Sequence, residues 1–169
     1  MSGKKRIVIV DENDEVIGYK ERETLIPEQD IYRVSALWVR NKQGDILLAQ
    51  RAFSKRHDPG KWGPAVAGTV EEGETYESNI RKEAEEEIGL TGYEFKKAIK
   101  TRSPGTPHNH FTQWFTLTID EPADFFTIQE DEVADIRWFS EKELREEFDR
   151  YPEKFLKSML KRLELFSDP

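Results

Sequence analysis

The sequence contains no cysteine. It can therefore form no disulfide, no thiolate nucleophile and no zinc–thiolate site. Long apolar runs are also missing, because no stretch approaches the ~20 residues that a membrane-spanning helix needs. Residues 1–15 include a run of only four apolar residues, which is too short for a secretory signal sequence. These absences predict a cytoplasmic protein that does not enter a membrane.

Positively charged residues are fewer than negatively charged ones. The sequence has 26 Lys and Arg residues and 34 Asp and Glu residues, which gives a net charge of −8. This balance disfavours binding to a nucleic acid polymer, where neutralisation of phosphates dominates the affinity. A small anionic substrate remains compatible if local basic groups or a metal ion offset the field of the protein. With 169 residues, 36% of them hydrophobic and 36% charged, the chain suits one globular domain with a heavily charged surface.

Apolar segments separated by turn residues predict a mixed α+β domain that spans residues 1–169. The expected strands are 6–10 and 16–19, paired as a first hairpin, 32–40 and 45–51, paired as a second, and then 65–67, 93–100, 111–119 and 134–139. Helices are expected at about 75–88, from a capping box at 140–143 to about 149, and from Pro152 through Leu163. We expect a central mixed sheet covered by these helices, with residues 1–30 as an N-terminal hairpin and connector.

The most informative stretch is residues 68–90, GTVEEGETYESNIRKEAEEEIGL. Its Glu83, Glu86 and Glu87 are spaced so that a helix would bring all three carboxylates to one face. Like charges at this spacing cost an isolated helix about 0.2–0.5 kcal/mol per pair, which a bound cation would offset. A solvated helix face is the alternative interpretation. Thr75 is a good N-cap and Gly89 a good terminator, so loop, helix and end are all encoded locally.

This stretch resembles the Nudix box, G-x5-E-x7-R-E-U-x-E-E-x-G-U, in which U is aliphatic or small. The matching residues are Gly68, Glu74, Glu83, Ala84, Glu86, Glu87, Gly89 and Leu90. One position departs, because Lys82 stands where the box has arginine. The resemblance implies an α/β/α sandwich and the metal-dependent hydrolysis of a diphosphate linkage in a small molecule.

The resemblance also implies roles for individual residues. Glu83, Glu86 and Glu87 would hold the metal and act in catalysis, with the Gly68 carbonyl as a further ligand. Because these donors are all oxygen atoms, Mg²⁺ or Mn²⁺ is the expected cofactor. Glu74 and Lys82 would support the site as an ion pair, although lysine lacks the planar fork of arginine.

Outside the box, Glu132 is the favoured later acidic residue near the metal, although a solvated acidic turn explains it equally well. A basic segment, 52–63, and the residue before it provide substrate-binding candidates that would complement a diphosphate. These candidates are Arg51, Lys55, Arg56 and Lys61, together with Trp62 and Trp114 as surfaces on which a base could stack. A buried position in the core is the favoured interpretation for at least one of the two tryptophans. The spacing of His108 and His110 is compatible with zinc, but an exposed mobile loop is the favoured interpretation.

The segment from Gln50 to Glu74 also resembles isopentenyl-diphosphate isomerase, a Nudix relative. That enzyme requires a cysteine near the position of Val66 and Ala67, so the isomerase reaction is not expected here and a hydrolase of the isomerase-like branch is. A binding domain that keeps the fold without catalysis is the remaining alternative. A homodimer paired through the N-terminal hairpin is compatible with the sequence.

Overall fold

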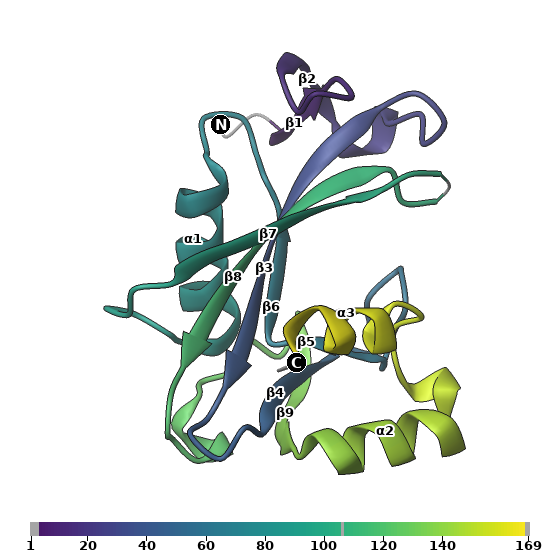
Figure 1. Ribbon diagram of the computed structural model, residues 1–169. Coiled ribbons are helices and arrows are strands. Elements are labelled where there is room, and N and C mark those ends of the chain that lie inside the picture. Colours follow the sequence, from purple (N-terminus) through teal and green to yellow (C-terminus); the bar gives the residue numbers. More distant parts are fainter. Residues whose placement is uncertain (1–3, 106, 168–169) are drawn as a thin grey trace.

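The computed structural model describes residues 4–105 and 107–167. A curled mixed sheet of nine strands forms the centre of the molecule, as Figure 1 shows. The strands are β1 (Arg6–Val10), β2 (Val16–Glu21), β3 (Ile31–Arg40), β4 (Ile46–Arg51), β5 (Trp62–Pro64), β6 (Val66–Thr69), β7 (Lys96–Ser103), β8 (His110–Thr118) and β9 (Val133–Phe139). The α-helices are α1 (Tyr76–Ile88), α2 (Glu141–Arg150) and α3 (Met159–Phe166). The predicted α+β sandwich is confirmed.

Strand β3 is central in the sheet and pairs with four other strands. It runs parallel to β8 from the pair Tyr32–His110 to the pair Arg40–Thr118, and it also pairs antiparallel with β1, β4 and β6. The predicted second hairpin is correct only near its turn, because β3 and β4 share just two residue pairs. Beyond the turn β4 leaves β3 and pairs with β5 instead, whereas β9 pairs with β4 along its whole length.

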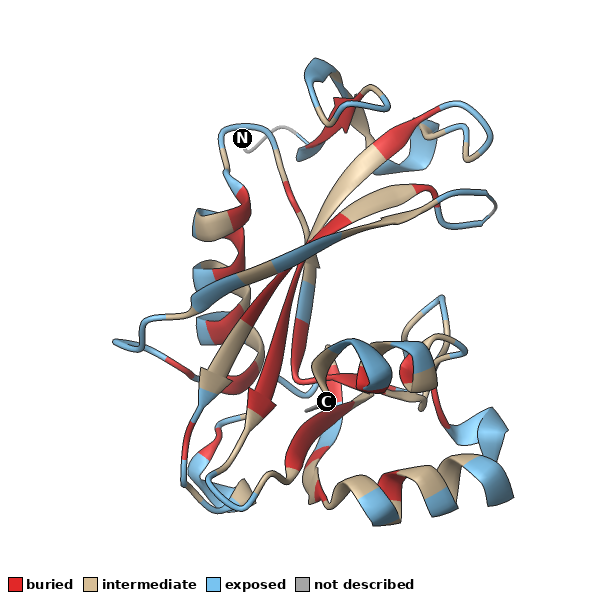
Figure 2. Cartoon of the chain, in the orientation of Figure 1, coloured by how far each residue is buried: buried red, intermediate tan, exposed pale blue. Residues whose placement is uncertain are grey.

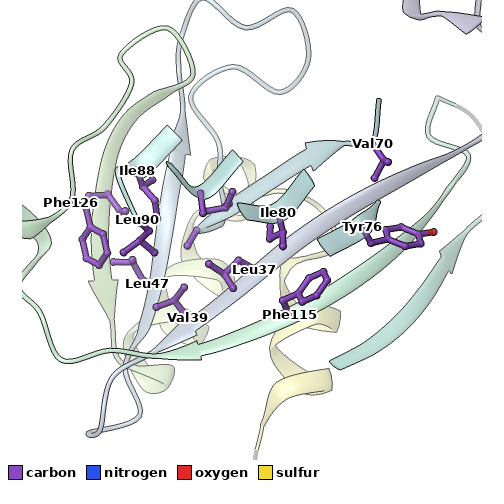
Figure 3. Packing of buried hydrophobic residues seen from close by; sticks show 14 of the residues in the cluster. Leu37, Val39, Leu47, Val70, Tyr76, Ile80, Ile88, Leu90, Phe115 and Phe126 are labelled. Carbon is purple, nitrogen blue, oxygen red and sulfur yellow. The ribbon is translucent and has the colours of Figure 1, made fainter. Parts of the chain in front are cut away.

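Two hydrophobic cores lie on opposite faces of the sheet. The first is covered by α1, and Figure 3 shows Ile80 and Ile88 of this helix against sheet residues that include Leu37. The second is covered by α2 and α3, whose Leu144, Met159 and Leu163 lie against Trp38 and other buried residues. Figure 2 shows the consequence, since most of β3 and the middle of β8 are buried while α1 is exposed on its outer side.

The C-terminal helix differs from the prediction. The single helix expected from Pro152 is divided into a short 3₁₀ turn, Pro152–Lys154, and α3. Phe155 is extended between them because it forms an isolated bridge with Trp62, and the amide of Leu156 donates to the Trp62 carbonyl at 3.0 Å. The predicted capping box is half correct: Ser140 accepts from the Glu143 amide, but the Glu143 carboxylate pairs with Arg137.

Two strand predictions also needed correction. The expected strand 93–100 begins later and ends later, as β7, where it pairs with β8 from Lys96 to Ser103. The segment expected as 65–67 is two short strands, β5 and β6, one on each side of Ala65. Between strands, 3₁₀ turns occupy Arg22–Thr24 and Ala123–Phe125. No helix within residues 4–105 and 107–167 is long and apolar enough to cross a membrane.

Candidate active site

The box folds as strand, loop and helix. Gly68 lies in β6, and α1 begins after Thr75, whose side chain accepts from the Ser78 amide at 3.0 Å. The Ser78 hydroxyl in turn accepts from the Thr75 amide, so both ends of a capping box are satisfied. Gly89 ends the helix with a φ of 71°, a left-handed conformation that suits glycine. The predicted helix and both of its terminal signals are confirmed.

Gly68 leaves room for Glu83. A Cβ atom at Gly68 would lie 2.4 Å from Cγ and 2.7 Å from Cδ of Glu83, far closer than van der Waals contact. The Glu83 side chain therefore lies directly on the backbone of β6. This contact connects the first glycine of the box to its first helical carboxylate, which are 15 positions apart in the sequence.

Glu83 and Glu87 form a half-buried carboxyl pair on α1. Burial raises the pKa of Glu87 well above its usual range, and the nearby Glu83 charge and a hydrogen bond between the two groups raise it further. Burial also raises the pKa of Glu83, against the lowering effect of Lys82. Two carboxyl groups this close resist ionising together unless a proton or a cation lies with them.

The donors at this place fit a hard divalent cation. They are oxygen atoms only, and the missing Cβ of Gly68 lets a carboxylate approach the β6 backbone. Glu86 is exposed on the same helix, close enough to raise the pKa of Glu83. In the part of the chain that the structure describes, no group of three His, Asp or Glu side chains is already gathered as a complete ligand set. Glu83 and Glu87 are two carboxyl groups that the structure does bring together.

Lys82 ties the box loop to the helix. Its ammonium group forms ion pairs with Glu74, with Glu71 at 3.4 Å and with Glu83 at 3.7 Å. Burial opposes ionisation of Glu74, but hydrogen bonds from Lys82 and Asn79 outweigh it and hold the pKa of Glu74 below its usual value. Lysine at this position thus makes the contact to Glu74 that the sequence resemblance implied.

Glu132 reaches the same site from the segment before β9. It forms an ion pair with Lys55 at 2.5 Å, and the charges of both residues act on Glu87. Backbone hydrogen bonds fix this arrangement: the Ala52 amide donates to the Glu132 carbonyl at 3.0 Å, and the Gln129 amide to the Glu87 carbonyl at 2.9 Å. Glu132 is therefore beside the box carboxylates in space, although 45 positions separate it from Glu87.

The other predicted substrate-binding residues are distributed around the 52–61 loop. Arg51 donates from Nε to the His57 carbonyl at 3.0 Å, and Arg56 is exposed. Lys61 pairs with Asp58 at 3.5 Å. Trp62 is half-buried and lies against Phe139, with ring centroids 5.4 Å apart. Of these residues the structure brings only Lys55 into contact with a predicted catalytic carboxylate.

Trp114 is the tryptophan of the expected pair that belongs to the core, and only part of the histidine segment is an exposed loop. Trp114 is 2% exposed in the second core, so its ring is not available for stacking on a ligand. His108 is exposed, but His110 is half-buried and begins β8, so the prediction of an exposed loop is wrong for His110. Two surface depressions of about 400 Å³ each lie elsewhere. Residues such as Ile80 and Phe115 line one, residues such as Asn41 and Trp138 line the other, and neither lining includes Glu83, Glu86 or Glu87.

The N-terminal hairpin touches the box loop, which sequence reasoning did not foresee. Arg6 makes two hydrogen bonds to Glu72, at 2.6 and 2.7 Å, and its carbonyl accepts from the Glu72 amide at 2.8 Å. Val8 donates to the Val70 carbonyl at 3.1 Å. The alternation of apolar residues predicted the strand but gave no signal for its partner.

A second contact joins the hairpin turn to the start of α1. The Asp14 carboxylate accepts from the Tyr76 hydroxyl at 2.9 Å, from Arg33 at 2.7 Å and from Lys100 at 2.6 Å. Burial opposes its ionisation, but the hydrogen bonds from Lys100, Arg33 and Tyr76 hold the pKa of Asp14 below its usual value. The hairpin thus contacts both the loop and the helix of the box.

Comparison with known proteins finds a matching family and several relatives. The model of the NUDIX domain family matches residues 31–159. A Nudix hydrolase of Yersinia pestis is 28% identical over 151 residues, which are 89% of this chain and 81% of that protein.

Two solved structures share the fold. The crystal structure of DR0079 from Deinococcus radiodurans has a TM-score of 0.83 at 23% identity and covers 96% of this chain and 99% of its own. The NUDIX domain of Shewanella oneidensis NrtR, crystallised with ADP ribose, has a TM-score of 0.61 at 18% identity and covers 85% of this chain and 92% of its own.

Proposed function

This chain belongs to the Nudix family and is a pyrophosphohydrolase of the Nudix type, and on that premise we propose that it cleaves a diphosphate linkage with the help of Mg²⁺ or Mn²⁺. The substrate class is a nucleoside diphosphate derivative or a related organic diphosphate. The observation that carries this proposal is the Glu83–Glu87 carboxyl pair, held over Gly68 and approached by Lys55 and Glu132.

Each residue has a distinct part in this proposal. Glu83, Glu86 and Glu87, with the Gly68 carbonyl, would hold the cation, which when bound neutralises charge on the diphosphate oxygens. Lys55 would bind a phosphate oxygen, since its ammonium group already lies among the carboxylates. Glu132 would orient the attacking water. Glu74 and Lys82 would keep the loop against the helix, and Arg51, Arg56 and Trp62 would contact the rest of the substrate.

A substrate screen tests the reaction. The protein is incubated with nucleoside di- and triphosphates, dinucleotide polyphosphates, nucleotide sugars and non-nucleotide diphosphates, each with Mg²⁺, with Mn²⁺ and with a chelator. We expect release of phosphate or nucleoside monophosphate from at least one class, and its loss with the chelator. Tight binding of one compound with no turnover of any would reject the hydrolase in favour of a binding domain.

A matched pair of variants tests the metal ligands. Glu86→Gln and Glu85→Gln each remove one carboxylate charge from neighbouring exposed positions of α1. We expect Glu86→Gln to lower kcat by about 100-fold or more, because the cation loses a ligand that acts in the transition state. Glu85→Gln should stay near the wild-type rate, and both variants should keep the wild-type melting temperature. Equal rates for the two variants would remove Glu86 from the site.

Isomerase chemistry is not part of the proposal, because the chain contains no cysteine. Incubation with isopentenyl diphosphate and Mg²⁺ should yield no dimethylallyl product. ADP ribose, the ligand crystallised with the NrtR domain, belongs in the panel as a nucleoside diphosphate derivative of the proposed class. The homodimer, the isomerase-like branch and the cytoplasmic location stay predictions.

A further inference from the structure

The three histidines of the chain come together at one place. The ring centroids of His57 and His108 are 6.3 Å apart, and those of His108 and His110 are 6.2 Å apart. They arrive from three segments: the 52–61 loop, the loop before β8, and β8 itself. None of the three histidines has a part in the function proposed above.

An arginine without a carboxylate partner adjoins the histidines. Arg162 of α3 lies over the Trp114 ring, with its guanidinium carbon 5.4 Å from the ring centroid, and its charge acts on both His108 and His110. Among residues 4–105 and 107–167 its side chain makes no ion pair and no side-chain hydrogen bond. In a chain of net charge −8 this guanidinium is desolvated without a counter-charge, which is costly.

His110 is a neutral hydrogen-bonding group at neutral pH. Burial, together with the charges of His108, Arg162 and Arg102, lowers the pKa of His110 to about 4. The pKa of His108 is lowered by burial in the same way, against the raising effect of Asp58. Nδ1 of His110 lies 3.1 Å from the Thr112 hydroxyl, which leaves Nε2 free of any side-chain hydrogen bond in the described part of the chain.

The surroundings favour an anion over a metal ion as the ligand. No metal-ligand group of three His, Asp or Glu side chains is found within the described ranges. A guanidinium offers several N–H donors in a planar fork that matches phosphate oxygens, and neutral imidazoles add single donors around it. A further guanidinium is close by, because Arg102 donates to the His110 carbonyl at 3.4 Å.

One loop joins this cluster to the carboxylates. Lys55 of the 52–61 loop contacts Glu132 at the box, and His57, two residues later, contacts His108. Arg51 holds this loop by donating to the His57 carbonyl. An elongated substrate with its diphosphate at Lys55 would therefore direct its far end along the loop toward the histidines.

We propose that His57, His108, His110 and Arg162 form a second anion-binding site, which takes a phosphate group other than the diphosphate that is cleaved. The phosphate comes from one of two sources: the far end of the substrate, or free inorganic phosphate. The first source rests on the proposed function, whereas the binding site itself does not.

Binding is tested with inorganic phosphate and no substrate. The histidine ring resonances of the full chain are followed by NMR during a phosphate titration at pH 7.5 and constant ionic strength. We expect a saturable shift of the His108 and His110 signals. Arg162→Gln should weaken phosphate binding about tenfold or more, because it removes a charge-assisted contact. Lys161→Gln, which removes the same charge from the exposed neighbouring position, should bind like the wild type.

A second variant guards against misfolding of Arg162→Gln. His108 is exposed, so His108→Asn should keep the fold, and we expect it to weaken phosphate binding severalfold. A titration without saturable shifts, or equal affinities in Arg162→Gln, His108→Asn and Lys161→Gln, would overturn the proposal.

The source of the phosphate is distinguished by kinetics. Two nucleoside diphosphate derivatives are compared that differ only in an additional phosphate on the ribose. If the far end of the substrate occupies the site, the additional phosphate lowers KM in the wild type and in Lys161→Gln but not in Arg162→Gln. If KM is equal for both substrates while inorganic phosphate still binds, the site takes the free anion. Absence of all turnover would refute the proposed function and leave the NMR result standing.

Discussion

Gly68 shows how one residue can matter through the atoms it lacks. The Glu83 side chain occupies the space where a Cβ atom at Gly68 would lie, so the glycine allows this carboxylate to lie against β6. A methyl group there would collide with the flexible end of Glu83 and not with backbone. The side chain would move away, at a cost in stability at the low end of the roughly 1–3 kcal/mol typical of overpacking.

We therefore predict that Gly68→Ala loses activity without losing the fold. The kcat should fall about 100-fold and the Mg²⁺ concentration for half-maximal activity should rise, because Glu83 no longer points at the cation. Gly18→Ala is the control, since nothing lies within 4 Å of the added Cβ there. Activity and melting temperature are measured for both. A Gly68→Ala variant as active as the Gly18→Ala variant would contradict the role given to Glu83.

Lys82 is the other single residue on which the site depends. Its side chain reaches Glu74, Glu71 and Glu83 together, so the replacement of arginine keeps the connection of loop to helix. The sequence indicated the Glu74 pair through the resemblance to the box. It gave no sign of Asn79, which donates to both Glu74 and the Thr69 carbonyl, because a buried asparagine on a helix has no distinctive pattern.

At the level of elements, the N-terminal hairpin is part of the site's support. Strand β1 is buried from Ile7 to Val10, pairs with β3, and bonds to the box loop through Arg6 and Val8. The family match begins only at residue 31, so this support lies outside the matched domain. Its two hydrogen bonds from Arg6 to Glu72 fix the loop that Lys82 also holds.

A charge exchange tests this support. We predict that Arg6→Glu destabilises the protein by about 1 kcal/mol, the upper range for a partly exposed pair, and lowers kcat because the loop before α1 loosens. The double variant Arg6→Glu with Glu72→Arg should recover at least half of both losses. Lys4→Glu, at an exposed position of the same segment whose ion pair is 4.0 Å long, controls for charge alone. Failure of the double variant to recover kcat would separate the hairpin from the site.

Elements with local signals could be predicted from the sequence, and elements defined by distant partners could not. Helix α1 has its cap at Thr75 and its terminator at Gly89, so its ends were predicted within one residue. The break at Phe155 depends on a bridge to Trp62, 93 positions away, and its apolar spacing alone continues as a helix. The same limit explains why β3 and β4 were predicted to pair along their whole length.

At the scale of the whole molecule, the curled sheet brings together charges that no local pattern connects. Lys55 meets Glu132 across 77 positions, and three histidines meet Arg162 on the face of the sheet that α3 covers. The list of box carboxylates could be predicted because the box is contiguous. The histidine cluster could not, because its members come from three segments whose convergence depends on the parallel pairing of β3 with β8.

This convergence gives His110 a contribution to the global stability that depends on pH. Burial lowers the pKa of His110 from 6.5 to about 4, so between these values the unfolded chain binds a proton that the folded chain does not. The contribution of His110 to the free energy of unfolding then falls as pH decreases from about 6.5 to about 4, and this group contributes no slope above that window. The groups that oppose its protonation are His108, Arg162 and Arg102.

We predict that His110→Gln removes this slope. The free energy of unfolding is measured with urea at pH 8. The difference between the two proteins at that pH gives the cost of losing the ring contacts of His110, chiefly with Tyr32, whose ring centroid is 5.2 Å away. Relative to that difference, the free energy of unfolding of the wild type should fall by up to about 3 kcal/mol more than that of the variant between pH 6.5 and 4. This amount follows from the lowered pKa of His110. Parallel curves for the two proteins across this window would mean that His110 is protonated in the folded state, and that the cluster is open to water instead of desolvated around Arg162.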